Sequence, residues 1–282
     1  MKLQNAKADV FIPDGADPDA AMKRTTHLGI GAHQDDLEIM AYHGILQCYD
    51  STSDWFTAVT CTDGAGSARA GKFARYTDEE MQRVRLQEQK EAARVGRYAA
   101  ALQLGYSSKE VKASPAAKLE ADLAAIVLAA NPRVIYTHNP ADKHPTHVAV
   151  MGAAIRALRS LPRERRPQWL FGCEVWRDLD WLSDRRKVVL DVSRRKSLAE
   201  SLVKIFESQI AGGKRYDLAS LGRRRANATY LDSHATDTMD AAIFAMDLTP
   251  VLYDDSLDIM TYTTAAIDEF RQSVAETLVK VK

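Results

Sequence analysis

The chain has 282 residues, enough to bury a substantial core in one large domain or two small ones. Lys plus Arg and Asp plus Glu both number 38, so no excess of charge favours a nucleic-acid or membrane partner. The longest apolar run, residues 123–130, is far shorter than the roughly 20 residues that cross a bilayer.

The cysteines and the first residues bear on the compartment. Cys48, Cys61 and Cys173 lie far apart, form no CxxC pair and cannot all be paired with one another. The first seven residues lack the apolar centre of a signal peptide. We therefore expect a cytoplasmic protein with reduced thiols.

The first half of the chain predicts alternating strands and helices. Residues 1–24 are rich in Asp, Pro and Gly, which predicts an irregular arm before a single domain at 25–282. Residues 27–32 and 55–62 are apolar and predict strands, and the pattern of residues 37–49 predicts a helix between them.

Thr77 and Glu80 form a capping-box pattern, which predicts a helix that runs to about residue 100. Pro145 suits the first turn of a second helix, which continues through Leu158. Further strands are expected at 102–106, 134–138, 169–176 and 187–192, with helices at 118–130 and 194–210. This alternation predicts an α/β fold: a three-layer, Rossmann-like, largely parallel sheet with helices on both faces and right-handed crossovers.

Polar residues follow two of the predicted strands. His33, Asp35 and Asp36 come after the strand at 27–32, and His144 and His147 come after the strand at 134–138. In α/β sheets, ligands bind at the carboxyl ends of the strands. Zinc hydrolases commonly use three His or carboxylate ligands and keep a fourth position for water. These residues therefore suffice for a metal site with a spare acid or base.

Two motifs resemble the signatures of a known family, the PIG-L/LmbE-like zinc-dependent N-acetylglucosaminyl deacetylases. The first is Ala32-His33-Gln34-Asp35-Asp36 with Glu38, and the second is His144-Pro145-Thr146-His147. Three further blocks agree with the family pattern: RLQE at 85–88, CEVW at 173–176 and KIFESQ at 204–209. The resemblance covers about residues 26–210, and the two motifs in this order are specific.

The resemblance implies a ligand set and a reaction. His33, Asp36 and His147 would hold one divalent ion, most often zinc. Asp35 would be the general base, and His144 would stabilise the oxyanion or protonate the leaving group. A zinc-bound water would attack the N-acetyl group of an amino sugar or its glycoside, releasing acetate and a free amine. The expected partner is thus a small N-acetylated substrate, and self-association is left open.

Elementary chemistry supports the same roles for the two adjacent aspartates. Side chains of adjacent residues in an extended segment point to opposite sides, so one Asp can bind the metal while its neighbour faces the water. Zinc lowers the pKa of bound water to about 7, and a nearby carboxylate can then accept its proton.

Other residues have two readings each. Glu38 either faces solvent or accepts a hydrogen bond from a ligating histidine, and we favour the second reading. Arg85 either binds substrate or forms an ion pair with Glu88. Asp63 lies at the expected site edge but also suits a turn before Gly64, and Asp142 is expected to shape the pocket.

The motif residues also have structural readings. Asp35 or Asp36 is a common type of helix cap, and His144 stands where a cap would precede Pro145. The correct pairing and order of the two motifs favour the catalytic reading.

The chain departs from the family pattern at Gln34, at Tyr42-His43 and at Thr146, which stand for a proline, a glycine pair and an aspartate. Thr146 puts the role of His144 in doubt, because a nearby carboxylate would favour the charged imidazole, unless Asp142 replaces it. Two alternatives therefore remain open: an amidase acting on a non-sugar metabolite, and a metal-binding member that has lost catalysis.

Overall fold

The computed structural model describes residues 1–281, in which one eight-stranded sheet has the order β1-β4-β3-β2-β5-β6-β8-β7. The five neighbours from β4 to β6 are parallel, whereas β1, β7 and β8 pair antiparallel at the two edges. The strands are β1 Asp9–Phe11, β2 His27–Gly31, β3 Phe56–Thr62, β4 Ala100–Tyr106, β5 Val134–His138, β6 Trp169–Cys173, β7 Lys187–Asp191 and β8 Ala242–Asp247. The predicted largely parallel α/β sheet is confirmed.

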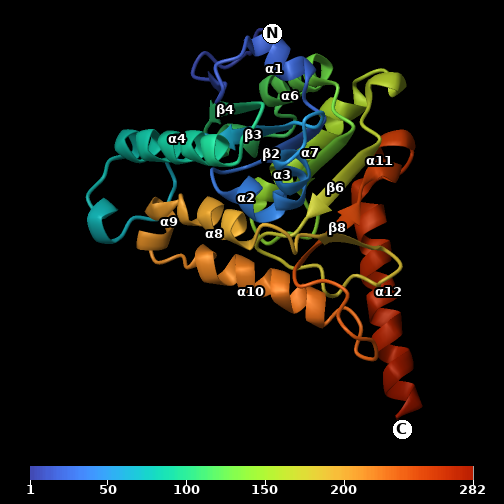
Figure 1. Cartoon of the computed structure of the whole chain (residues 1–282). Helices are drawn as coiled ribbons and strands as arrows, with labels where there is room; N and C mark the ends of the chain where they lie inside the picture. Colours follow the sequence, from blue (N-terminus) through green and yellow to red (C-terminus); the bar gives the residue numbers. More distant parts are fainter. Residues whose placement is uncertain (282) are drawn as a thin grey trace.

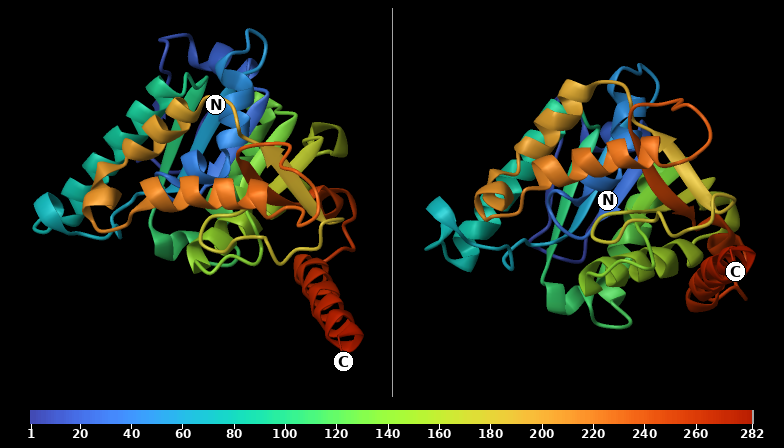
Figure 2. Two further views of the ribbon diagram at one scale, coloured as in Figure 1. Left: turned by 60° about the horizontal axis from the view of Figure 1, so that its bottom comes forward. Right: turned by 90° about the horizontal axis from the view of Figure 1, so that it is seen from below.

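Helices cover both faces of this sheet (Figures 1 and 2). One apolar core contains residues of α1, α6, α7 and α11, and a second contains residues of α2, α3, α4 and α8. The helices are α1 Pro18–Lys23, α2 Asp36–Met40, α3 Tyr42–Tyr49, α4 Asp78–Val95, α5 Ser108–Val111, α6 Ala117–Ala130, α7 Pro145–Arg159, α8 Lys196–Lys204, α9 Glu207–Ala211, α10 Tyr216–Thr229, α11 Thr249–Tyr253 and α12 Ile259–Lys280.

Strand β3 shows why the sheet is buried on both sides. Its side chains alternate between the two cores: Phe56 and Ala58 pack in one, Val59 and Cys61 in the other. Alternate residues of a strand point to opposite faces, so a strand covered by helices on both sides must be apolar throughout. All seven residues of β3 are buried.

The first 24 residues correct a prediction. The expected irregular arm contains β1, which pairs with β4, and α1, which Asp17 caps by accepting a hydrogen bond from the Ala20 amide at 3.0 Å. A three-residue strand is too short to show a period of two in the sequence, and its partner lies about ninety residues further on.

Three predicted helices end differently from expectation. The helix expected at 37–49 is two helices that meet at Ala41, and the helix expected at 194–210 is broken between Lys204 and Glu207. Helix α4 does begin with the predicted Thr77–Glu80 capping box, but it ends at Val95 because residues from Ala100 onward pair with β3.

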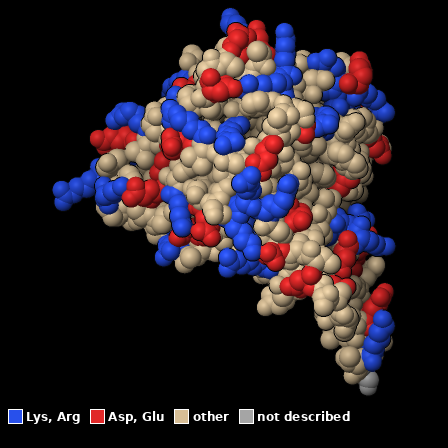
Figure 3. Space-filling model, in the orientation of Figure 1, with Lys and Arg blue, Asp and Glu red and all other residues tan. Residues whose placement is uncertain are grey.

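The end of the chain adds elements that the sequence did not reveal, namely β8 and α10 to α12. Helix α12 leaves the body of the molecule in Figures 1 and 2. Within residues 1–281, no helix is long and apolar enough to cross a membrane. Positive and negative side chains are interspersed on the face shown in Figure 3, as the balanced composition implies.

Candidate metal and catalytic site

The sheet register brings the two sequence motifs together. Strands β2 and β5 are parallel neighbours, with His27 opposite Val134, so both end at the same edge of the sheet. His33 and Asp36 follow β2, and His147 lies in the first turn of α7, which follows β5. The His33 amide donates to Asp36 Oδ2 at 2.6 Å, which fixes this carboxylate at the start of α2.

Three side chains at this edge have the spacing of metal ligands. His33 Nδ1 lies 3.2 Å from His147 Nε2, and Asp36 carboxylate oxygens lie 3.4 Å from each of these nitrogens. Ligands bound tetrahedrally to zinc at about 2.0–2.1 Å are separated by about 3.3 Å. The donor set therefore fits a zinc-sized ion, and its chemistry, two imidazoles and one carboxylate, suits zinc as well.

A second set of residues shares two of these ligands. Asp36, His138 and His147 are also close enough to hold an ion. However, His138 Nε2 accepts a hydrogen bond from the Ala32 amide at 2.9 Å, so its lone pair is engaged. His138 is completely buried, whereas His33 lines a cavity that substrate can enter. A catalytic ion needs an open position, which favours the set with His33.

The charges of the site stabilise one another. Burial alone would raise the pKa of Asp36, but His147 and His138 hold it well below its ordinary range. Burial alone would lower the pKa of His147, but Asp36 and then Asp142 raise it. Asp142 Oδ2 lies 3.5 Å from His147 Nδ1, on the side of the ring away from Asp36. Such a carboxylate orients a ligating histidine and increases its basicity.

Asp35 has an unusual backbone conformation. Its φ of 103° lies in a region that residues with a side chain rarely adopt. It occupies the N-cap position of α2, yet its carboxylate makes no capping hydrogen bond. Instead, Asp35 Oδ2 lies 3.2 Å from Arg85 Nη2. Burial raises the pKa of Asp35, while Arg85 opposes this shift. Strain of this kind is typical of functional residues.

Arg85 is the centre of a buried network. The side chain is 1% exposed and also donates to the Gln34 carbonyl and to Ser208 Oγ. The predicted contact with Glu88 is present, at 3.5 Å. Arg85 thus contacts the proposed base directly, and it also lines the cavity.

His144 caps α7, which is one of its two predicted roles. Its Nδ1 accepts a hydrogen bond from the Thr146 amide at 3.3 Å, which caps α7. Because Nδ1 is an acceptor, the proton of the neutral ring lies on Nε2, the atom left to donate. Burial and the neighbouring His147 lower the pKa of His144 to about 4. The side chain is thus a neutral donor that lines the cavity.

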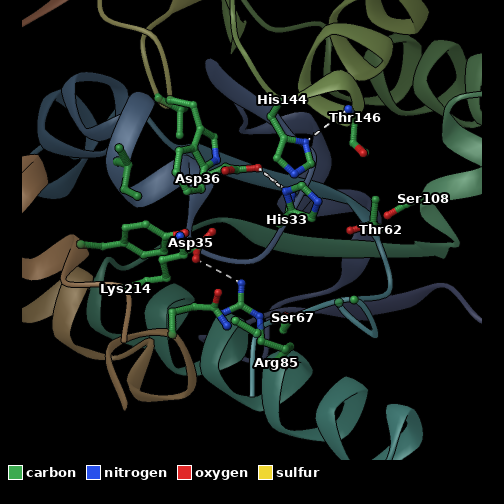
Figure 4. A pocket seen from close by; sticks show the side chains of 18 of the residues that line it. His33, Asp35, Asp36, Thr62, Ser67, Arg85, Ser108, His144, Thr146 and Lys214 are labelled. Atoms are coloured by element: carbon green, nitrogen blue, oxygen red, sulfur yellow. Dashed lines mark hydrogen bonds and ion pairs between the residues drawn. The ribbon is translucent and has the colours of Figure 1, made fainter. Parts of the chain in front are cut away.

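These residues line a cavity of about 370 Å³ (Figure 4). His33, Asp35, Asp36, Arg85 and His144 all contribute to its wall. The remaining lining residues are mostly polar or small, and they include Thr62, Ser67, Ser108, Lys112, Thr146, Trp176, Gln209, Lys214 and Tyr216.

Two predicted site residues lie elsewhere. Glu38 is completely buried and accepts hydrogen bonds from Tyr98 and Gln89, each at 2.8 Å, so it does not support a ligating histidine as we expected. Two residues beyond Asp36, it points to a different side of α2. Asp63 binds Gln82 at 3.0 Å and the Ala65 amide, and it lines a different hollow.

Asp142 lies beside the site, as expected. It faces His147 and accepts the His144 amide hydrogen at 2.9 Å. It also opposes the lowering of the His144 pKa, so it supplies part of the negative charge that Thr146 lacks. The sequence reasoning also missed the contact of His138 with Asp36 and the cavity positions of Trp176, Lys214 and Tyr216. The position of His138 at the end of β5 was a usable signal, whereas the other three follow from tertiary packing.

A family model matches the part of the chain that carries both motifs. Residues 28–158 match the family model described as PIG-L, GlcNAc-PI de-N-acetylase. A comparison with curated protein sequences found no match.

Solved structures share the fold. One is N,N'-diacetylchitobiose deacetylase from Pyrococcus horikoshii bound to an inhibitor, with TM-score 0.64, 15% identity and coverage of 82% of this chain and 86% of that chain. A second is the A40926 pseudoaglycone deacetylase, with TM-score 0.59, 16% identity and coverage of 79% and 97%. A third is 4-carboxy-2-hydroxymuconate hydratase from Pseudomonas putida KT2440, with TM-score 0.57, 14% identity and coverage of 79% and 95%.

Proposed function

We propose that the protein is a zinc-dependent hydrolase that removes the N-acetyl group from an amino sugar or its glycoside. The match of residues 28–158 to the PIG-L family model, which the two motifs predicted, supports this proposal. One observation carries the proposal: two imidazole nitrogens 3.2 Å apart, each 3.4 Å from an oxygen of the Asp36 carboxylate, lie beside a strained, buried Asp in an open cavity. The names of two structural neighbours, both deacetylases, support it.

In this proposal His33, Asp36 and His147 hold the ion, and Asp142 orients His147. The bound ion would polarise the carbonyl group of the substrate and acidify a water molecule. The two imidazoles and single carboxylate leave the site with a net positive charge once a divalent ion is present, which favours the negative charge that develops on the carbonyl oxygen.

Asp35 accepts the proton of the attacking water and returns it to the nitrogen of the departing amine. Arg85 holds the carboxylate at 3.2 Å, so the base is oriented before substrate arrives. His144 donates from Nε2 to the carbonyl oxygen, because its Nδ1 is engaged with the Thr146 amide. Thr146 therefore contributes through its backbone, and the missing carboxylate does not prevent this role.

The test is acetate release. The purified protein is incubated with N-acetylglucosamine and its glycosides, with the protein zinc-loaded, stripped by a chelator, and stripped and then reloaded. We expect acetate from the first and third samples only. Metal binding without acetate from any amide would favour a member that has lost catalysis.

A parallel panel of N-acetylated amino acids and N-acetylated polyamines separates the sugar substrate from the non-sugar alternative. If only these compounds yield acetate, the substrate is not a sugar, but the proposed hydrolase activity stands.

The neutral donor role of His144 predicts that His144→Ala lowers kcat while it leaves the bound metal in place.

A further inference from the structure

Two lysines face the cavity without an acidic partner. Lys112 follows α5, and Lys214 lies in the loop between α9 and α10. Neither makes an ion pair within residues 1–281. Five lysines pair with a carboxylate, namely Lys72, Lys90, Lys187, Lys196 and Lys204. Others among residues 1–281, such as Lys109 and Lys118, make no ion pair either, so what distinguishes Lys112 and Lys214 is their position on the cavity wall.

The acids of the cavity do not neutralise these lysines. Asp36 belongs to the proposed ligand set, and Asp35 is paired with Arg85. A divalent ion in the site would add two further positive charges. With the ion bound and the substrate absent, the cavity would therefore carry a net positive charge. A positively charged cavity concentrates and binds anions.

Lys214 lies beside Trp176 on the wall of the same cavity. Its amide donates to the Gln209 carbonyl at 3.0 Å, after Gly213 has turned the chain with a φ of +87°. Its Nζ lies 5.0 Å from the centre of the Trp176 ring. That ring lies 6.4 Å from the His144 ring, at an interplanar angle of 28°. In Figure 4, Lys214 and Asp35 lie on one side of the cavity, and Ser108 and Thr62 lie on the other.

A second hollow, which adjoins the cavity at Trp176, is also lined by positively charged side chains. This hollow of about 200 Å³ shares Ile39, Val175, Trp176 and Tyr216 with the main cavity. Arg223 and Arg224 line it. Arg224 is 3% exposed, and its Nε and Nη1 atoms have no hydrogen-bond partner within the described structure. Buried donors of this kind are costly unless a ligand satisfies them.

We propose that the substrate carries an anionic group, a carboxylate or a phosphate, which Lys214 binds next to the N-acetylamino group being hydrolysed. This inference rests on the proposed deacetylase function and names the chemistry of its substrate. Trp176 provides a flat apolar surface for the substrate body, and Lys112 adds positive charge from α5. A neutral amino sugar would leave both lysines without an anionic partner.

The experiment compares binding of matched amines by calorimetry to the zinc-loaded protein. The ligands are glucosamine, glucosamine 1-phosphate, glucosamine 6-phosphate and muramic acid, which carries a carboxylate. We expect at least one anionic ligand to bind ten times more tightly than glucosamine, and this advantage to shrink as salt is raised. The phosphate and carboxylate ligands distinguish the two kinds of anion.

The test variants are Lys214→Gln, Lys214→Arg and the double variant Lys112→Gln/Lys214→Gln. The control is Lys118→Gln, because Lys118 is exposed on α6 and does not line the cavity. Lys214→Gln should reduce the anion preference to less than threefold, and the double variant should abolish it. Lys214→Arg and Lys118→Gln should retain it. Both lysines are exposed, so their replacement should not unfold the protein.

Acetate release from the corresponding N-acetylated compounds is measured in parallel. Equal affinity for neutral and anionic ligands, or a preference that survives the double substitution, overturns the inference. Anion-selective binding that depends on Lys214 but yields no acetate would refute the proposed hydrolase and leave the anion site standing. Acetate release with no preference for anionic ligands would support the proposed hydrolase and refute the anion site.

Discussion

At the scale of single residues, the site depends on which atoms of a few side chains are free. Nδ1 of His33 and Nε2 of His147 face one another at 3.2 Å, whereas Nε2 of His138 accepts a backbone hydrogen. The same distinction sets the donor atom of His144. The imidazoles of this site therefore differ in which ring nitrogen is free, because their nitrogens have different contacts.

The proposed ligand set predicts which variants lose metal. His33→Ala, Asp36→Ala and His147→Ala should each weaken zinc binding by more than about 100-fold, since loss of a supporting partner alone costs 10–100-fold. His138→Ala should retain zinc, as should the exposed control His234→Ala. Metal analysis of folded protein after dialysis provides the measurement. Retention in His33→Ala together with loss in His138→Ala would assign the ion to the other set.

The proton-transfer role predicts a different outcome for Asp35. Asp35→Asn should keep its zinc but lower kcat by at least about 100-fold, the usual scale of general-base catalysis. Arg85→Lys should reduce activity less, because it keeps a cation near the carboxylate but loses the planar donor pair. Steady-state acetate assays on metal-replete protein measure both effects. Near-normal turnover of Asp35→Asn would move the base to another residue.

At the scale of elements, close packing of α3 on the sheet fixes the position of the preceding helix α2, which begins with Asp36. Gly44 lies in α3 directly against β5: a Cβ added there would lie 2.5 Å from Tyr136 Cε2 and 3.2 Å from Phe56 Cε2. Both aromatic side chains are completely buried. Tyr42 and His43 replace the glycine pair of the family pattern, and the close approach of α3 to the sheet occurs at Gly44, directly after them.

This contact predicts opposite effects for two helical glycines. Gly44→Ala gains up to about 1 kcal/mol of helix propensity but loses about 1–3 kcal/mol by overpacking, so we expect a net loss of stability. Gly222→Ala in α10, where an added Cβ meets nothing within 4 Å, should raise stability by up to about 1 kcal/mol. Urea unfolding of the two variants beside the wild type measures the difference. A stabilised Gly44→Ala would mean that α3 shifts to make room.

At the scale of the whole molecule, two histidines away from the site couple folding to pH: His27, which is buried, and His43, which is half-buried. Burial, aided by Arg133 and opposed by Asp54, lowers the pKa of His27 to about 4. Burial also lowers the pKa of His43 to about 4. In the unfolded chain a histidine has a pKa near 6.5, so the unfolded state binds more protons between these values.

The sign of the pH dependence follows. The stability that a neutral buried histidine contributes is present above about pH 6.5 and is lost as the pH falls towards 4, with a slope of up to about 1.4 kcal/mol per pH unit for each histidine. His27→Gln and His43→Gln should each flatten the fall in the free energy of unfolding between pH 7 and pH 5. Burial raises the pKa of Glu38 to about 7, an effect of opposite sign that is common to all variants and cancels in the comparison. Unchanged slopes in both variants would contradict this assignment.

The sequence by itself determined the parallel core of the sheet and the strand ends that carry the motifs. Hydrophobic alternation and capping patterns such as Thr77 with Glu80 operate within a few residues, so they can be recognised locally. The tertiary structure alone decided the partners of the polar side chains: Asp35 with Arg85, fifty residues away, Asp142 with His147, and Glu38 with Tyr98. It also placed β1 and Lys214, because pairing and cavity walls depend on contacts between distant segments. No local pattern encodes these contacts, since their energy arises only once the chain has folded.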